Sequence, residues 1–422
     1  MKHRKRVRVE DLRVGMRLIG LDKPWMETPF LWHRMVLRDK GQIEKIAACG
    51  AHYAEIETEE LVEKQAIEQN IEHAIEKPKE EAFQDTPEAP PPALTAALPE
   101  LVPFSEELAP ANEIYNAAKN LLLEAVEDVR MGREVNVAAV IGVVENILDS
   151  LVRNPDTLPS LTQLKSHDEY TFSHSVNVGI LVVAFGRHHG LAPDALLRLG
   201  VGGLLHDIGK VRVPLSILNK PGRYTKDEYD VMKRHPETGG EILHRTPGIA
   251  EDSIHPALEH HERGDGTGYP YNKTLAKMNP FGLITQLADV YDAMTSERVY
   301  HKERPPYEVL RYLYARGQSG HFDLSMVQKF IQCVGIYPVG SLVELNTGES
   351  GIVMSVNRNW LLAPRVLITQ GRNGPLSPPY LELDLAEPNL RPLRTIMSVQ
   401  DHSSLNINLA DYLAKPQHRQ AE

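Results

Sequence analysis

Histidine and aspartate side chains that can bind metal ions recur between residues 174 and 289 of this sequence. They are His174, His206, Asp207, His235, His260, His261 and Asp289. A single helical histidine is more often a core or surface residue than a ligand. Imidazole and carboxylate together, however, suit Fe, Mn or Ni, with Zn as an alternative, better than Ca or Mg. These ligands are too many for one ion and suit two.

The sequence context of these residues strengthens the metal interpretation. His206 and Asp207 follow the apolar run VGGLL, and Asp289 follows GLITQLA. A buried carboxylate without a partner costs several kcal/mol or more, and a metal ion compensates for that cost. His260 and His261 are neighbours and point about 100° apart on a helix, so both reach a metal only in a pocket between helices.

Two ions with a bridging carboxylate are suited to one kind of chemistry. Asp207 is expected to be the bridge, because a carboxylate has two oxygens. Paired divalent ions clamp the attacking and leaving oxygens of a phosphodiester and make a shared water acidic. The constellation therefore predicts phosphodiester hydrolysis.

A glycine-rich loop, GDGTGYP, follows the two adjacent histidines at residues 264–270. Gly264, Gly266, Gly268 and Pro270 predict irregular backbone that can approach a ligand closely. Tyr269 offers a flat face on which a base can stack. A tight turn that only ends a helix is the alternative.

Basic residues accompany both predicted aspartate ligands. Lys210 lies about one helical turn beyond Asp207, and Arg298 and Lys302 follow Asp289. These cations would neutralise substrate phosphate, although solvated surface positions are the competing interpretation.

Length and composition limit the function classes. A chain of 422 residues is typical of two or three domains, and the net charge of -11 argues against binding to long nucleic acid. Cys49 and Cys333 are expected to be reduced thiols. The basic start lacks the apolar run of a signal peptide, and no stretch approaches the ~18 apolar residues of a membrane span. We therefore expect a cytoplasmic protein.

The apolar periodicity predicts a mainly α protein with small mixed and β parts. Residues 1–64 are expected to form a small α+β domain, and residues 65–110 a Glu/Pro/Ala-rich helix and linker. Residues 111–336 are expected to be all-helical, with helices at 161–190, 193–209, 226–246, 249–263, 280–296 and 306–334. Residues 337–422 are expected to form a β-rich appendage, with strands in 341–357 and 365–369, and a frayed tail.

The motifs resemble one known family. HD at 206–207, HHE at 260–262 and GDGTGYP at 264–270 resemble the HD-GYP branch of the HD phosphohydrolases, from about Tyr115 to Gly335. The resemblance implies an all-helical domain, a centre of two or three ions, often iron or manganese, and hydrolysis of cyclic di-GMP to pGpG or GMP in bacterial signalling. It also implies that the seven residues above are the metal ligands.

The resemblance further implies substrate contacts. Asp207 and Lys210 would act in catalysis, the latter by touching phosphate, and the dinucleotide would be held by Asp168, Lys210, Gly268, Tyr269, Pro270, Arg298 and Lys302. Residues 6–64 resemble the uncharacterised domain that often precedes HD-GYP domains, for which dimerisation or control of catalysis is the hypothesis.

Three positions depart from the family pattern. Tyr170 stands where members with three metals have glutamate, which predicts two ions here. Gly264 stands where an aromatic residue is common, which predicts a looser loop. His301 stands where lysine is common, with Lys302 beside it.

Two other functions remain open at the level of sequence. The protein could sense cyclic di-GMP without cutting it, or dock on a diguanylate cyclase through the GYP loop. It could also hydrolyse another cyclic dinucleotide, such as a cyclic GMP-AMP. A homodimer is a further expectation.

Overall fold

The computed structural model describes residues 3–9, 12–13, 16–21, 35–37, 43, 46, 53–58, 102–163, 170–220, 222–296, 304–372, 374–377, 380–390, 393–400 and 418–420. The chain forms two compact units, residues 1–86 and 87–422. Most of the predicted segment 65–110 lies outside the described residues, as do Asp168, Arg298 and Lys302. The predicted domain boundaries therefore stay predictions.

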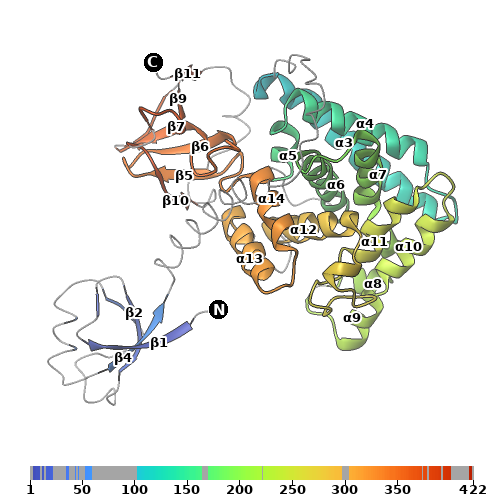
Figure 1. Ribbon diagram of the computed structural model, residues 1–422, viewed down its shortest axis with the longest axis horizontal. Helices are drawn as coiled ribbons and strands as arrows, with labels where there is room; N and C mark the ends of the chain where they lie inside the picture. The colour runs from blue at the N-terminus through green and yellow to red at the C-terminus, as the bar shows by residue number, and fades with distance from the viewer. Residues whose placement is uncertain are drawn as a thin grey trace, which may run out of the picture. The chain divides into compact units, whose positions relative to one another are not determined.

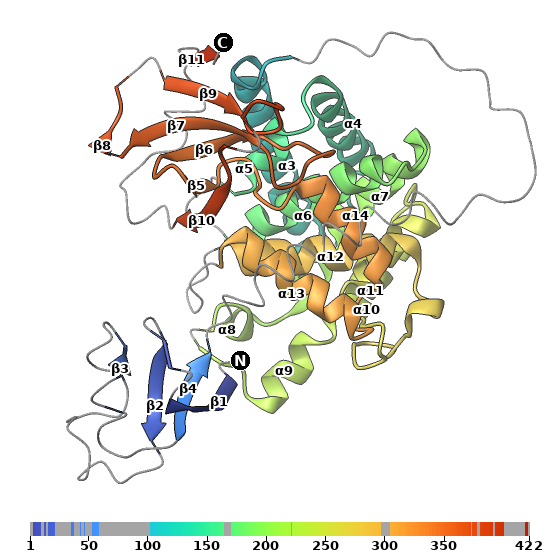
Figure 2. The same cartoon turned by 60° about the vertical axis from the view of Figure 1, so that its left-hand side comes forward.

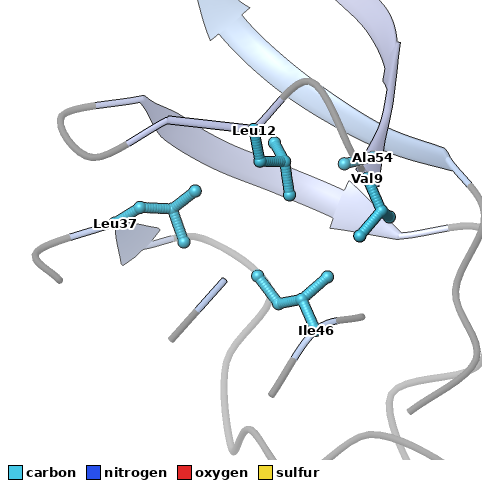
Figure 3. Close-up of a cluster of buried hydrophobic side chains, with 5 residues drawn as sticks. All are labelled: Val9, Leu12, Leu37, Ile46 and Ala54. Atoms are coloured by element: carbon cyan, nitrogen blue, oxygen red, sulfur yellow. The ribbon is translucent and has the colours of Figure 1, made fainter. Parts of the chain in front are cut away.

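The first unit contains a small antiparallel sheet of order β1-β4-β2-β3. Its strands are β1 (His3–Arg8), β2 (Arg17–Leu21), β3 (Met35–Val36) and β4 (Tyr53–Thr58). A cluster of apolar side chains beside the sheet forms its core (Figure 3): Val9, Leu12, Leu37, Ile46 and Ala54. The β part of the expected α+β unit is confirmed, with β3 as an additional strand, and the expected helix lies almost entirely outside the described residues.

Residues 104–334 form the helical body of the second unit (Figure 1). Its helices are α3 (Phe104–Arg130), α4 (Val137–Arg153), α5 (Thr157–Leu161), α6 (Tyr170–His188), α7 (Pro193–Leu205), α8 (Leu215–Leu218), α9 (Lys226–Met232), α10 (His235–Arg245), α11 (His255–Glu259), α12 (Pro280–Thr295), α13 (Pro306–Gln318) and α14 (Leu324–Val334), with the short 3-10 turns η4 (Ile208–Arg212), η5 (Glu251–Ile254) and η6 (Leu275–Lys277). Helix α6 packs against α3, α7, α12 and α14, which agrees with the run of apolar residues at 178–185 in this helix.

Three expected helices are divided in the structure. The segment 226–246 breaks before His235, because Pro236 cannot continue a helix that begins upstream of it. The segment 249–263 consists of η5 and α11 and ends at Glu259. The segment 306–334 breaks near Gly320, which has a positive φ of 77°.

Helix α3 begins at Phe104, not at Ala111 as expected, and Pro110 lies inside it. The carboxylate of Glu107 is buried and accepts hydrogen bonds from Arg153 Nε and Ser150 Oγ, both at 2.7 Å. These contacts hold the first turns of α3 against α4. They offset the backbone hydrogen bond that Pro110 removes.

The C-terminal part forms a sheet of order β10-β5-β6-β7-β9-β11, with β8 beside β7 (Figure 2). Its strands are β5 (Leu342–Leu345), β6 (Ser350–Ser355), β7 (Arg365–Gly371), β8 (Gly374–Pro375), β9 (Tyr380–Asp384), β10 (Ile396–Gln400) and β11 (His418–Gln420). The three predicted strands are confirmed as β5, β6 and β7. The expectation of a frayed end is wrong for His418–Gln420, which form β11 and pair in parallel with β9.

Within the described part of the chain, no helix combines the length and the apolar character needed to cross a membrane.

Candidate metal centre

The structure brings the seven predicted ligands together at one point in the helical body. His174 lies in the first turns of α6, and His206 and Asp207 end α7. His235 begins α10, Asp289 lies in α12, and His260 and His261 follow α11. Two groups form, His235 with His260 and His261, and His174 with His206 and Asp207, each with ligand atoms within 4.8 Å of one another.

Asp207 lies between the imidazoles of the two groups and turns one oxygen toward each set. Its Oδ1 is 3.3 Å from His235 Nε2 and 3.6 Å from His260 Nε2. Its Oδ2 is 3.5 Å from His206 Nε2 and 3.8 Å from His174 Nε2. A carboxylate in this position is suited to bridging two cations.

Asp289 also faces both groups. Its Oδ1 is 3.1 Å from His174 Nε2, and its Oδ2 is 3.9 Å from His261 Nδ1. Two carboxylates therefore lie among five imidazoles, all from helix ends or helix faces that turn inward.

Backbone carbonyls orient three of the imidazoles. Nδ1 of His206 lies 2.8 Å from the carbonyl of Gly203, and Nδ1 of His235 lies 2.7 Å from that of Met232. Nδ1 of His260 lies 2.8 Å from the carbonyl of Pro256. Because a carbonyl only accepts, these nitrogens carry the ring protons, and each Nε2 turns a lone pair toward Asp207. Such partners fix the tautomer of metal-binding histidines.

The inward-facing atoms lack protein partners that would satisfy them. His206 Nε2 and Asp207 Oδ1 are buried without a hydrogen-bond partner. The Nε2 atoms of His235 and His260 are 3.2 Å apart, although both Nδ1 atoms face carbonyls. Opposed lone pairs and orphaned buried polar atoms are costly, and a cation between them removes the cost. The donor set is compatible with divalent metal ions.

The protonation states favour ligation at neutral pH. Burial lowers the pKa of His206 to about 4 and that of His235 to about 3, and it also lowers the pKa of His261. Burial acts to raise the pKa of Asp207, but Lys210 and His206 outweigh it, and the pKa falls well below its ordinary value. The neutral imidazoles of His206 and His235 therefore face an ionised carboxylate.

Asp292 is a residue of the site that the sequence reasoning missed. Its Oδ2 is 2.6 Å from His174 Nδ1, and its Oδ1 accepts from Asn177 Nδ2 at 2.7 Å and from Ser296 Oγ at 3.2 Å. Burial acts to lower the pKa of His174, but hydrogen bonds with Asp289 and Asp292 raise it to about 9. The available signal was spacing, because residues three apart share a helix face.

Comparisons with known proteins agree with this geometry. A family model described as HD domain matches residues 156–326, and one described as domain of unknown function (DUF3391) matches residues 4–140. A Pseudomonas aeruginosa protein named cyclic di-GMP phosphodiesterase is 34% identical over 384 residues, which cover 90% of this chain and 89% of the relative. This chain belongs to the HD-GYP phosphodiesterase family. The resemblance inferred from the motifs is confirmed.

Two further relatives match shorter stretches of this HD-GYP protein. A Vibrio cholerae protein named cyclic di-GMP phosphodiesterase is 39% identical over 33% of this chain and 30% of its own length. A second protein from that organism, named 3'3'-cGAMP-specific phosphodiesterase 2, is 31% identical over 40% of this chain and 32% of its own length.

The GYP loop of this HD-GYP protein lies against the histidines. The Tyr269 ring lies 4.8 Å from the His261 ring, with 31° between their planes. Glu262 is fully buried, and its oxygens accept from the backbone nitrogens of Tyr271 at 2.6 Å and Lys273 at 2.9 Å. The sequence analysis quoted Glu262 within a motif but gave it no role. It holds the returning strand of the loop in place.

The expectation that Gly264 loosens the loop is wrong. Its N–H donates to the carbonyl of His321 at 2.8 Å, and its carbonyl accepts from Leu275 N at 3.3 Å. A Cβ at this position would lie 2.7 Å from the carbonyl oxygen of Gly320 and would overlap the Leu275 side chain. Gly268 likewise has backbone of Glu262 and Arg263 where a side chain would be. The loop is closely packed at both glycines.

Of the three basic residues predicted to neutralise phosphate, Lys210 lies within the described residues and beside the metal centre. It is partly buried, and its ammonium group donates to Asp207 Oδ2. Asp168, Arg298 and Lys302, which were predicted to contact the substrate, lie outside the described residues. Pro270, another predicted contact, follows Tyr269 through a cis peptide bond.

Proposed function

We propose that this HD-GYP protein hydrolyses cyclic di-GMP to pGpG or GMP and holds two divalent metal ions. The observation that carries the proposal is Asp207, whose two oxygens face two separate pairs of inward-turned imidazoles. The name of the P. aeruginosa relative supports the substrate. Fe, Mn or Ni fits the mixture of nitrogen and oxygen ligands, with Zn as an alternative.

The proposed ligands divide between two ions. His174, His206 and Asp289 would hold one ion, and His235, His260 and His261 would hold the other, with Asp207 shared. When bound, paired divalent ions polarise a phosphodiester and supply a nucleophile from water at neutral pH. None of the described residues near the cluster is needed as a general base for that step.

The other residues act by position and charge. The ammonium group of Lys210 pairs with Asp207 and balances its charge. With metal ions on Asp207, its ammonium group would be released to a phosphate oxygen of the substrate. Tyr269 offers a ring for stacking beside the histidines. Contacts from Asp168, Gly268, Pro270, Arg298 and Lys302 stay predictions.

The direct test is incubation of anaerobically loaded protein with cyclic di-GMP. We expect pGpG or GMP to form with Fe(II), Mn(II) or Ni(II) and to be absent in His206→Ala. His244→Ala is the matched control, because that side chain is 73% exposed and lies outside the cluster. Absence of hydrolysis with every one of these metals would refute the proposal.

The relative named as a 3'3'-cGAMP-specific phosphodiesterase suggests 3'3'-cGAMP as a second candidate substrate. Parallel assays with cyclic di-GMP and 3'3'-cGAMP, compared by kcat/KM, separate the two. Binding without turnover would identify a sensor instead. The cytoplasmic location, the homodimer and docking on diguanylate cyclases stay predictions.

A further inference from the structure

A pocket of about 200 Å³ opens beside the metal centre, and it is lined by Asp207 and Lys210. Helices α3, α6, α7 and α8 supply its remaining walls, and the GYP loop does not contribute to it. The pocket is thus continuous with the proposed phosphate position but distinct from the surroundings of Tyr269. Nothing in the family motifs accounts for it.

The walls beyond Asp207 and Lys210 are mainly apolar. They include Leu122 of α3, Phe172 of α6 and Leu215 of α8. Leu215 is 59% exposed, so a large apolar surface faces water at this point. Apolar walls with a few polar groups at one end are typical of a site for a flat organic ring.

A phosphodiester joins two nucleosides, which constrains where the substrate lies. With the cut phosphate at Asp207 and Lys210, one nucleoside extends to each side of the centre. Tyr269 offers a ring on one side, and the pocket opens from the same two residues on another. We infer that this pocket receives one base of the cyclic dinucleotide, an inference that rests on the proposed function.

Arg130 gives the pocket a means of choosing the base. Arg130 lines the pocket, and its guanidinium group is 4.0 Å from the carboxylate of Glu127, with side chains 43% and 51% exposed. An exposed pair at this distance is weak and leaves the guanidinium free to turn. Arginine donates two hydrogen bonds to O6 and N7 of guanine, whereas adenine presents an amino group at that edge. The pocket therefore selects guanine.

Two substitutions test the two parts of the inference. Leu215→Ser removes apolar surface from an exposed position, and we expect KM for cyclic di-GMP to rise about three- to tenfold with little change in kcat. Arg130→Gln replaces a guanine-reading side chain with one suited to adenine. We expect the ratio of kcat/KM for cyclic di-GMP over cyclic di-AMP to fall about tenfold or more.

Matched controls come from the same chain. Leu393→Ser alters a leucine that is 65% exposed in the β appendage, and Arg133→Gln alters an arginine near Arg130 that binds Asp128 instead of lining the pocket. Both controls should keep the wild-type KM and base preference. Metal content of all variants should match the wild type, which shows that the centre is intact.

The outcomes separate this inference from the proposed function. If the wild type cuts cyclic di-GMP while Leu215→Ser and Arg130→Gln behave as their controls, the pocket assignment alone is overturned. If only Arg130→Gln behaves as its control, the base site stands and guanine selection by Arg130 is refuted. If the wild type binds without turnover, calorimetric Kd replaces KM with the same expectations. If it neither binds nor cuts, both proposals fail.

Discussion

Asp292→Asn is a substitution whose effect on the metal centre follows from hydrogen-bond donors and acceptors alone. The carboxylate of Asp292 accepts at both oxygens, from His174 Nδ1 across 2.6 Å and from Asn177 Nδ2 across 2.7 Å. An asparagine has one carbonyl oxygen and one amino group. It must therefore present a donor to one of these two partners.

Both orientations of the new amide are unfavourable. If the amino group faces His174, the ring must accept at Nδ1 and carry its proton on Nε2, which then cannot bind a metal ion. If the amino group faces Asn177, two buried donors oppose each other at a cost of about 1–3 kcal/mol. Loss of such an orienting partner typically lowers metal affinity or activity about 10–100-fold, or about 1.4–2.8 kcal/mol.

The assay is a competition between the protein and a chelator for Mn(II), together with kcat/KM for cyclic di-GMP. Asp194→Asn is the control, because the Asp194 side chain is 81% exposed and pairs with Arg198 one turn along α7. We expect weaker binding of one ion and reduced kcat/KM in Asp292→Asn alone. Unchanged affinity and rate in that variant would refute the idea that Asp292 sets the tautomer of His174.

Three further predictions concern the fold around the centre. Glu107→Gln should lower the free energy of unfolding at pH 7 by about 1–3 kcal/mol. Burial acts to raise the pKa of Glu107, but hydrogen bonds from Arg153 and Ser150 hold it below 4.5. The difference in unfolding free energy between wild type and variant is therefore fully present above pH 4.5 and disappears as the pH falls through the pKa of Glu107 in the folded protein. Urea titrations at several pH values measure it. Gly264→Ala should lower Tm and raise KM, whereas Gly142→Ala, with open space around it, should not. Chelation should lower Tm of the wild type by calorimetry and should leave His206→Ala unchanged.

The predicted ligands could be identified from the sequence because their motifs place metal-binding side chains directly after apolar helical runs. Asp207 and Asp289 each follow an apolar helical run, so burial of a carboxylate could be anticipated at both. The sequence could not show which carboxylate oxygen faces which imidazole, because that depends on how α7, α10 and α12 pack against one another. Asp292 was missed since it reads as a helix residue until His174 is seen beside it.

The long-range polar contacts were also beyond the sequence. Glu107 pairs with Arg153, and Pro110 looked like the end of a linker without that contact. Gly264 looked like a source of mobility, but its environment comes from Leu275 and the carbonyl of Gly320, which lie outside the motif. Both errors arose where tertiary contacts override a local preference.

The helix breaks that were not anticipated are the features that orient the histidines. In a continuous helix the carbonyl of Met232 would accept from the N–H of residue 236, but Pro236 has none. The carbonyl is therefore left for His235 Nδ1, which turns Nε2 inward. In the short helix α11 the carbonyl of Pro256 faces His260 Nδ1 and also accepts from the backbone N–H of His260 at 3.3 Å.

Helix ends also suit the charge of the proposed ions. Helices α7, α9 and α11 all end beside the cluster, where the last carbonyls of a helix lack partners within it and carry partial negative charge. Each of these ends gives a carbonyl to a histidine Nδ1 and so turns an Nε2 lone pair toward Asp207. These helix ends thus fix the tautomers of three histidines and favour cations, while His174 and Asp289 reach the cluster from the inward faces of the longer helices α6 and α12.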